Sequence, residues 1–288
     1  MTNPYLSHRF EASLARTEHS MAFERLAEHP TRKSSLRVWF RSEAIATNLL
    51  LCVLAISSLG VAFCGSARGG PLREILLGYS VLHRPIMATE FGVGPNVTLV
   101  LGGMHGDEPT GTFVVERFIA YLNRHPRLAA GAEVVLVARV NPDGLARSSR
   151  VNADGVDINR NFPTRDWGRH AAQPRYNPGP ESASEPEAQI VIHLISALRP
   201  CRIITIHAPY HQLNIDGPAL PLARTMQHFD HYRITTSIGY PTPGSLGTYA
   251  GKERQIPVVT LELPPVSGTV AWAQNSRALL AAINLPCR

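Results

Sequence analysis

A chain of 288 residues, 44% of them hydrophobic, is long enough to bury a full core, and we expect one main domain behind an N-terminal extension. The net charge is +6, but the basic residues are scattered and form no run interleaved with aromatic side chains. The composition therefore gives no support to a nucleic-acid-binding protein.

The N-terminal extension divides into a polar part and an apolar part. Residues 1–43 carry both signs of charge, whereas residues 44–67 contain no charged side chain. A stretch of that length can cross a bilayer, and its basic flank predicts a cytoplasmic N-terminus with the remainder exported. We expect a bacterial protein that is either cleaved near residues 65–67 and released to the periplasm or anchored in the inner membrane. The alternative is a buried core helix in a cytoplasmic protein.

The four cysteines form two groups. Cys52 and Cys64 lie in the apolar segment, while Cys201 and Cys287 lie in the main domain, too far apart for a Cys-x-x-Cys motif. An oxidising compartment permits a disulfide between the second pair. Two separate buried thiols are the alternative, and the sequence leaves both open.

The main domain, residues 69–288, alternates between predicted strands and helices. An entry hairpin is expected at 75–81 and 84–88, and further strands at 97–101, 133–140, 202–206 and 258–261. Pro109 suits the first position of a helix that includes residues 113–122, and other helices are predicted at 185–198 and 267–283. This alternation is typical of an α/β fold with a mostly parallel sheet. Residues 141–144 have the composition of a tight turn, and residues 164–184 that of a surface loop.

Three of the predicted strands are followed by side chains that bind metals or move protons. The stretch LVLGGMHGDEPTGT places His105 and Glu108 between a strand and a helix, and His207 and Glu262 follow two later strands. The carboxyl ends of parallel strands meet at one edge of a sheet. Two histidines and a glutamate form a three-ligand zinc site with room for water, and Glu262 is placed to take the proton of that water.

Each of these four residues also has an ordinary structural interpretation. Taken singly, His105 and Glu108 are a surface pair, His207 is a hydrogen-bonded histidine at a strand end, and Glu262 is a salt-bridged edge residue. Their joint occurrence at strand ends favours the catalytic interpretation. In the loop between residues 141 and 163, Arg150 and Arg160 can present forked donors to an oxyanion or a carboxylate.

Longer motifs carry a resemblance to a known family. The segments GGMHGDEPTG, VNPDG, RVNADGVDINRNFP, ITIHAP, GYPTPGSLGTY and VTLELPP, spread over residues 71–265, resemble the M14 zinc carboxypeptidase family, and within it most closely the murein tripeptide amidases. The resemblance implies a mixed, mostly parallel eight-stranded sheet flanked by helices, one zinc ion per chain and a murein-derived peptide as substrate. By motif position the resemblance also implies the zinc ligands His105, Glu108 and His207, with Asp157 as the partner that orients the first zinc histidine. It implies that Glu262 is the catalytic glutamate and that Arg150 binds the oxyanion. It further implies that Asn159 and Arg160 bind the terminal carboxylate of the substrate and that Tyr240 is a mobile tyrosine that closes on the substrate.

Three functions are compatible with these motifs. The favoured one is an exported zinc amidase that cleaves the γ-D-glutamyl–meso-diaminopimelate bond. The second is an N-acyl amino acid amidohydrolase similar to succinylglutamate desuccinylase or aspartoacylase, although the motifs at 141–144 and 239–249 are more typical of a peptidase. The third is an inactive murein-binding module, which the complete set of ligands disfavours.

Diaminopimelate ends in a second carboxylate and an amine, so its pocket requires further polar groups. Asp216 in the segment NIDGP, together with residues 244–247, is the candidate for this recognition. The alternative is that Asp216 only forms a turn with Gly217, as Asp-Gly pairs commonly do.

Overall fold

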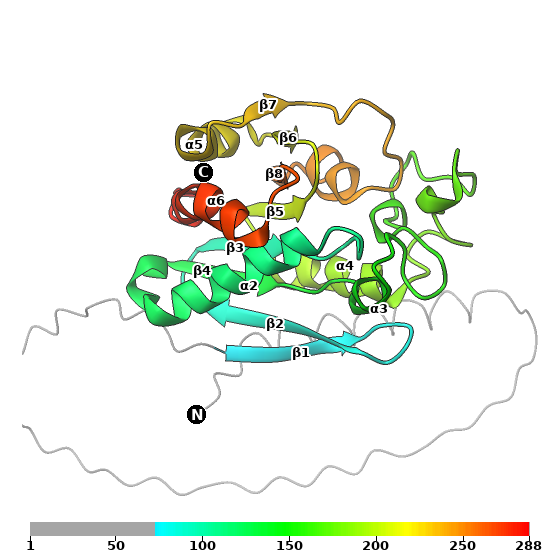
Figure 1. The fold of residues 1–288 in the computed structure, drawn as a ribbon, viewed down its shortest axis with the longest axis horizontal. Coiled ribbons are helices and arrows are strands. Elements are labelled where there is room, and N and C mark those ends of the chain that lie inside the picture. The colour runs from blue at the N-terminus through cyan, green and yellow to red at the C-terminus, as the bar shows by residue number, and fades with distance from the viewer. Residues whose placement is uncertain (1–72, 288) are drawn as a thin grey trace, which may run out of the picture. The chain divides into compact units, whose positions relative to one another are not determined.

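The computed structural model describes residues 73–287, and the fold is that of these residues (Figure 1). The predicted polar segment 1–43 and apolar segment 44–67 lie outside them. Among residues 73–287, no helix is both long enough and apolar enough to cross a membrane.

A mixed sheet of eight strands forms the centre of the domain, in the order β1-β2-β4-β3-β5-β8-β6-β7. The inner strands β4, β3, β5 and β8 run parallel to one another, β1 and β2 form an antiparallel hairpin at one edge, and β6 is antiparallel to β8. The predicted mixed, mostly parallel eight-stranded sheet is thus confirmed. The strands are β1 (Arg73–Tyr79), β2 (Pro85–Phe91), β3 (Asn96–Leu101), β4 (Ala132–Val137), β5 (Arg202–His207), β6 (Gln212–Asp216), β7 (Arg233–Thr235) and β8 (Val258–Glu262).

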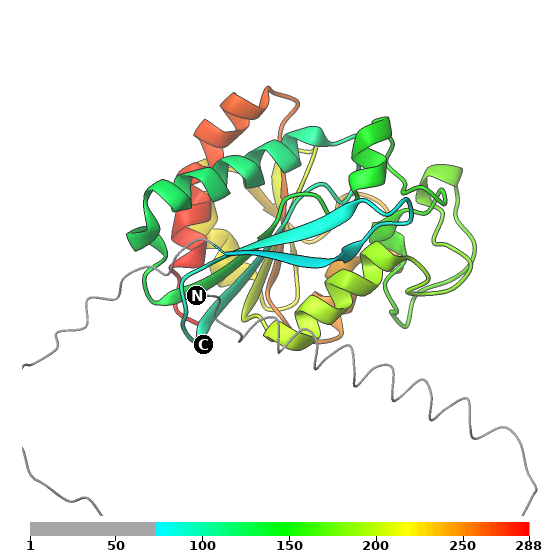
Figure 2. The same ribbon diagram turned by 90° about the horizontal axis from the view of Figure 1, so that it is seen from below.

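Helices cover both faces of the sheet and enclose two hydrophobic cores. Helices α2 and α6 lie on one face and α4 on the opposite face, as Figure 2 shows. The first core packs α2, α5 and α6 against the sheet, and the second packs α4 and the π-helix η4 against its other side. The helices are α2 (Pro109–Arg124), α3 (Pro142–Arg147), α4 (Pro186–Leu198), α5 (Leu220–Asp230) and α6 (Gly268–Ile283), with 3-10 turns η1 (Pro126–Ala129), η2 (Ile158–Arg160) and η3 (Pro174–Tyr176) and the π-helix η4 (Gly247–Lys252).

Strand position explains the residue patterns in the sheet. Every residue of β5 is buried, because helices cover a central strand of a parallel sheet on both faces. At the edge of the sheet, β1 alternates between buried or partly buried and exposed positions over most of its length. The uninterrupted apolar segments in the sequence therefore became the inner strands that carry the site.

The expected tight turn at residues 141–144 is wrong: this segment begins helix α3. Pro142 occupies the first turn of the helix, and the Asn141 side chain caps it by accepting a hydrogen bond of 2.8 Å from the Gly144 N–H. Asn followed by Pro suits a helix start as well as a turn, because the same side chain satisfies free backbone N–H groups in both. Strand β4 also ends at Val137, three residues before the expected end at Val140.

The long connection from residue 208 to residue 257 contains four elements that the sequence pattern did not separate. Strands β6 and β7 extend the sheet beyond β8, helix α5 packs against this extension, and β6 and the π-helix η4 contribute residues to the site. Strands β6 and β7 and the π-helix η4 have only three to six residues each, too few to display a clear period, whereas the sequence prediction missed α5 although it has 11 residues.

The last residues of the chain are bound to the amino end of β5. Cys201 and Cys287 form a disulfide, so the pairing that the sequence left open is present. The neighbouring Arg202 donates from Nη1 to the Ala282 carbonyl at 2.7 Å and from Nη2 to the Leu285 carbonyl. These contacts join the end of α6 to the sheet, at the opposite end of β5 from His207.

Candidate metal centre and substrate pocket

His105, Glu108 and His207 converge at the carboxyl ends of β3 and β5. His105 and Glu108 lie between β3 and α2, and His207 is the last residue of β5, which is the neighbour of β3 in the sheet. One potential ligand atom from each of the three residues lies within 4.8 Å of the others. Both imidazoles present Nδ1, since the two Nδ1 atoms are 3.1 Å apart and each lies 2.9 Å from a Glu108 carboxylate oxygen.

The opposite nitrogen of each imidazole is held by a side chain outside this cluster. His105 Nε2 lies 3.0 Å from Asp157 Oδ1, and His207 Nε2 lies 3.1 Å from Thr205 Oγ1. Such contacts fix the ring orientation and tautomer of a metal-binding histidine. The second Asp157 oxygen accepts a 2.9 Å hydrogen bond from Arg150 Nε, so one buried carboxylate positions both His105 and Arg150.

The electrostatic field of the cluster favours a cation. Burial by itself lowers the pKa of His105, but the Glu108 and Asp157 carboxylates reverse the effect and raise it to about 9. Burial raises the pKa of Glu108, whereas the two histidines hold it well below its usual range. A field that stabilises a proton between these groups also stabilises a metal ion at the same place. Two imidazoles and one carboxylate with fixed outer nitrogens therefore fit zinc.

Glu262 lies beside this cluster without belonging to it. It ends β8 and pairs with His207 across the parallel β5–β8 ladder. Its Oε2 atom is buried and has no hydrogen-bond partner among the residues that the structure describes. Burial raises the pKa of Glu262, and the nearby Glu108 raises it further, against the opposing effect of His207 and His105. A raised pKa makes the Glu262 carboxylate a better proton acceptor than an ordinary glutamate.

A cavity of about 530 Å³ opens over the cluster. It brings together nearly all of the predicted site residues, although they come from distant parts of the sequence. Asp157 is the exception: it is fully buried behind His105 and does not reach the cavity wall. The predicted residues that line it are His105, Glu108, Arg150, Asn159, Arg160, His207, Asp216, Tyr240 and Glu262.

Arg160 brings a buried positive charge to the cavity wall. Arg160 is only 4% exposed. Within residues 73–287 no carboxylate lies within 4 Å of its guanidinium. The guanidinium instead donates a hydrogen bond of 2.6 Å to the Asn159 carbonyl. The Asn159 side chain accepts a 2.9 Å hydrogen bond from the Leu246 N–H, which leaves its amide nitrogen for other contacts. A buried guanidinium of this kind is suited to an anionic ligand.

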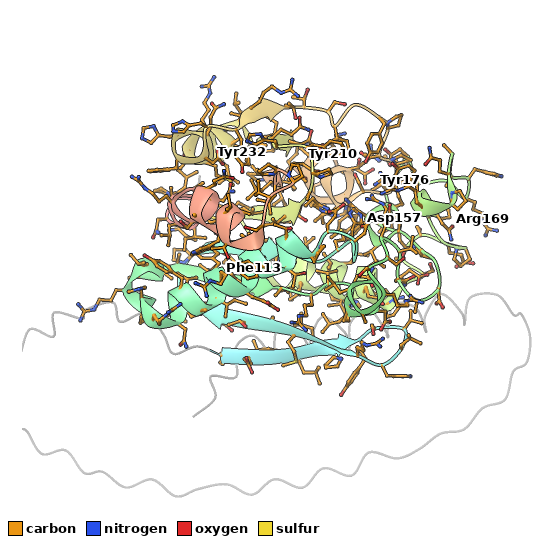
Figure 3. All side chains as sticks on the ribbon, viewed as in Figure 1. Phe113, Asp157, Arg169, Tyr176, Tyr210 and Tyr232 are labelled. Carbon is orange, nitrogen blue, oxygen red and sulfur yellow. A yellow bond between two sulfur atoms is a disulfide. The ribbon has the colours of Figure 1, made fainter. Side chains whose placement is uncertain are left out.

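Aromatic side chains surround the arginines of the pocket. The Tyr176 ring has the guanidinium carbons of Arg150 and Arg160 at 5.1 and 5.4 Å from its centroid, and the Tyr240 ring lies 5.6 Å away. Burial and the neighbouring Tyr210 hydroxyl raise the pKa of Tyr240, so this tyrosine stays protonated at neutral pH. In Figure 3, Tyr176 and Tyr210 lie on the same side of the domain as Asp157, whereas Arg169 lies farther out on the surface loop.

Several residues in or next to the pocket were not predicted from the sequence. Thr205 was identifiable in principle, since it lies two residues before His207 and a strand places such positions on the same face. Tyr176, Tyr210 and Lys252 lie on irregular or short segments whose place in space follows no periodic pattern.

The fold and the ligand cluster define a metal-dependent hydrolase of the α/β class. The chain belongs to the zinc carboxypeptidase family, whose model matches residues 72–275. Two curated relatives named murein peptide amidase A, from Vibrio campbellii and Escherichia coli K12, are each 32% identical, over 219 and 221 residues. These alignments cover 72% and 73% of this chain, and 85% and 86% of the relatives.

Solved structures confirm the fold. The crystal structure of murein-tripeptide amidase from Escherichia coli O157 matches with a TM-score of 0.62 and 28% identity, covering 76% of this chain and 95% of that one. Carboxypeptidase A from Helicoverpa armigera matches with a TM-score of 0.64 at 16% identity, covering 75% and 69% of the two chains, and shares the fold. The protein is therefore a zinc-dependent metallopeptidase of this family, with one zinc site among its described residues.

Proposed function

We propose that this protein hydrolyses murein peptides at the γ-D-glutamyl–meso-diaminopimelate bond. The observation that carries the proposal is Arg160, a buried guanidinium that forms no ion pair within 4 Å in the described domain and faces the cavity that holds the zinc ligands. A free carboxylate on the leaving residue of a peptide can form that direct ion pair. The 32% identity to two relatives named murein peptide amidase A supports murein as the source of that peptide.

His105, Glu108 and His207 hold the zinc ion in this proposal, and Asp157 and Thr205 keep the two imidazoles in the required tautomer. When bound, zinc lowers the pKa of a water ligand and polarises the carbonyl of the scissile bond. Glu262 accepts the proton of the attacking water and returns it to the leaving amine, for which its raised pKa is suited.

Arg150 is positioned to stabilise negative charge on the carbonyl oxygen of the scissile bond. Its Nη1 atom lies 3.4 Å from Glu108 Oε1, at the border of the ligand cluster, while Asp157 holds its Nε. A preorganised donor of this kind acts on charge that develops in the transition state. Asn159 and Arg160 bind the terminal carboxylate, Tyr240 in the cavity wall closes on the substrate, and Asp216 contacts the far end of the leaving residue.

The test offers the zinc-loaded full chain three substrate types: L-Ala-γ-D-Glu-diaminopimelate, ordinary peptides with free C-termini, and N-acyl amino acids. We expect the highest kcat/KM for the murein tripeptide. Arg160→Lys is expected to raise KM because lysine cannot form the bidentate contact with a carboxylate. A preference for N-acyl amino acids would instead support the amidohydrolase alternative, and bound zinc without turnover of any substrate would support the inactive binding module.

We propose further that the main domain is exported, with the segment 44–67 as the exporting signal or membrane anchor. The Cys201–Cys287 disulfide supports this, because disulfides persist mainly in oxidising compartments. Alkaline phosphatase fused after residue 90 is expected to be active in a bacterial host. An inactive phosphatase beside an active cytoplasmic reporter at the same junction would favour the cytoplasmic alternative.

A further inference from the structure

The cavity continues away from the zinc ligands along a row of polar side chains. Strands β6 and β8 are antiparallel, with Asn214 opposite Thr260 and Asp216 opposite Val258. Side chains two residues apart in a strand share a face, and Glu262, Thr260, Asn214 and Asp216 all line the cavity. The row extends over four residue positions, which corresponds to about 13 Å of strand. The pocket therefore extends well beyond the reacting bond.

The far end of this row holds two opposite charges in contact. Lys252, at the end of η4, lies with its Nζ 3.3 Å from Asp216 Oδ1. The Asp216 side chain is 9% exposed and the Lys252 side chain 56% exposed, so the carboxylate is fixed while the ammonium can move. The other Asp216 oxygen lies 3.4 Å from the Asn214 amide nitrogen.

The π-helix η4 is shaped around the Asp216 carboxylate. A Cβ atom on Gly247 would lie 2.2 Å from Asp216 Oδ2, and one on Gly251 would lie 2.6 Å from Asp216 Cβ. Only glycine at both positions allows η4 to approach this closely. The chain bends directly after Asp216, where Gly217 has a φ of +66°, but the Asp216 carboxylate itself lies on the cavity wall.

We propose that Asp216 and Lys252 together recognise a zwitterionic group at the end of the substrate side chain. The Asp216 carboxylate accepts hydrogen bonds from the ammonium of the ligand, and the Lys252 ammonium donates to the carboxylate of the ligand. These two contacts replace the contact between Asp216 and Lys252. This inference rests on the proposed function. In that function Arg160 binds the terminal carboxylate of the leaving residue, and this places the leaving residue at the Glu262 end of the row.

The charge balance of the pair selects among side chains. Asp216 alone would favour any cationic side chain, but Lys252 cancels that preference and repels an isolated ammonium. An isolated carboxylate meets the converse repulsion from Asp216, and a neutral side chain leaves both charges without a new partner. A group that carries both charges satisfies both residues, and this difference provides specificity.

The experiment uses the zinc-loaded full chain and four tripeptides, L-Ala-γ-D-Glu-X, that differ only at the end of the last side chain. X is meso-diaminopimelate, with both charges; lysine, with the ammonium alone; 2-aminopimelate, with the carboxylate alone; or norleucine, with neither. We expect the wild-type kcat/KM to be about 10- to 100-fold higher for diaminopimelate than for the other three, the usual effect of charge-assisted hydrogen bonds.

Two single variants are expected to change this preference in opposite directions. Lys252→Met leaves Asp216 unneutralised, so the ratio of lysine to 2-aminopimelate turnover rises about 10-fold or more. Asp216→Asn keeps the size of the side chain and frees Lys252, so the same ratio falls by a similar factor. Arg224→Met, which removes an exposed cation from α5, is the matched control and is expected to keep the wild-type ratios. Thermal melting of each variant reports on folding.

A purely structural role for the Asp216–Lys252 contact makes a different prediction. In that case both variants lower turnover of all four tripeptides by the same factor, and this result would overturn the proposal. Equal wild-type turnover of the diaminopimelate and norleucine peptides would also refute it while leaving the murein amidase function intact. Turnover of none of the four by a zinc-loaded enzyme that cleaves other peptides would instead refute the proposed function.

Discussion

His207 and Glu262 lie directly opposite each other at the carboxyl ends of two neighbouring parallel strands, β5 and β8. Adjacent strands are about 4.8 Å apart, so the backbone ladder itself sets the distance between a zinc ligand and a carboxylate that is not a ligand. The Leu263 N–H continues this connection with a 2.8 Å hydrogen bond to the His207 carbonyl. The chemistry of the site therefore depends on the register of one strand pair.

Replacement of Glu262 tests its role as the proton acceptor. Glu262→Gln keeps the size of the side chain but cannot take up the proton of the water, so kcat is expected to fall roughly 10²–10⁴-fold while zinc stays bound. Steady-state kinetics and metal analysis of the same preparation measure both effects. Glu116→Gln removes a carboxylate from an exposed ion pair with Arg139 and serves as the control. Near-normal turnover by the zinc-bound Glu262 variant would exclude this role.

Removal of one zinc ligand tests the metal centre. His105→Ala leaves only Glu108 and His207 at the cluster, and we expect the variant to lose zinc and activity together. Metal content is measured by atomic absorption after dialysis, with His170→Ala as the control because His170 is exposed. A variant that retains one zinc per chain would show that the ligand assignment is wrong.

Asp157 is expected to influence zinc affinity without touching the metal. It holds His105 Nε2 and Arg150 Nε, and neutralising it weakens both contacts. Asp157→Asn should weaken zinc binding by about 10- to 100-fold, the usual effect of losing the partner of a ligating histidine. Competition with a chelator of known affinity measures this change. Asp154→Asn, three residues away and exposed, should bind zinc as the wild type does.

The carboxyl group of Asp230 predicts a pH dependence of stability away from the site. Burial raises the pKa of Asp230 to about 6 from its ordinary value of 3.8, so the folded state binds more protons than the unfolded state between these values. The free energy of unfolding contributed by this group therefore falls as the pH rises through that window.

Asp230→Asn should remove that dependence. Because solvent still reaches part of the Asp230 side chain, we expect a discounted gain of about 1–2 kcal/mol above pH 7 and no gain below pH 4. The Asn side chain can still accept the 2.9 Å hydrogen bond from the Tyr232 N–H. Urea denaturation at pH 4 and pH 7.5 measures the difference. An equal effect at the two pH values would contradict the assignment.

The disulfide is expected to stabilise the domain substantially. Cys201 and Cys287 are 86 residues apart in sequence, and cross-linking a loop of that length constrains the unfolded chain. We expect the double variant Cys201→Ser/Cys287→Ser to lose about 2–4 kcal/mol of unfolding free energy, visible as a lower Tm. Reduction of the wild type should reproduce this loss and leave the Tm of the double variant unchanged.

Local sequence determined the elements that carry the ligands. The apolar segments that became β3, β5 and β8 are continuous because both of their faces are covered, and Pro109 began α2 as its missing N–H predicts. Since parallel strands end at a common edge, His105, His207 and Glu262 were predictable as neighbours. The helix start at Asn141 was not, because its residues suit a turn equally well.

Other relationships were decided only by the tertiary structure. Asp216 and Lys252 are 36 positions apart on a short strand and a π-helix, and Asp157 and His105 are 52 apart on segments with no period of their own. The physical reason is that hydrogen-bonding periodicity within a strand or helix is local and leaves a pattern in the sequence. Strand pairing, loop packing and the burial of one charge against another arise from contacts between distant segments, which only the folded chain brings together.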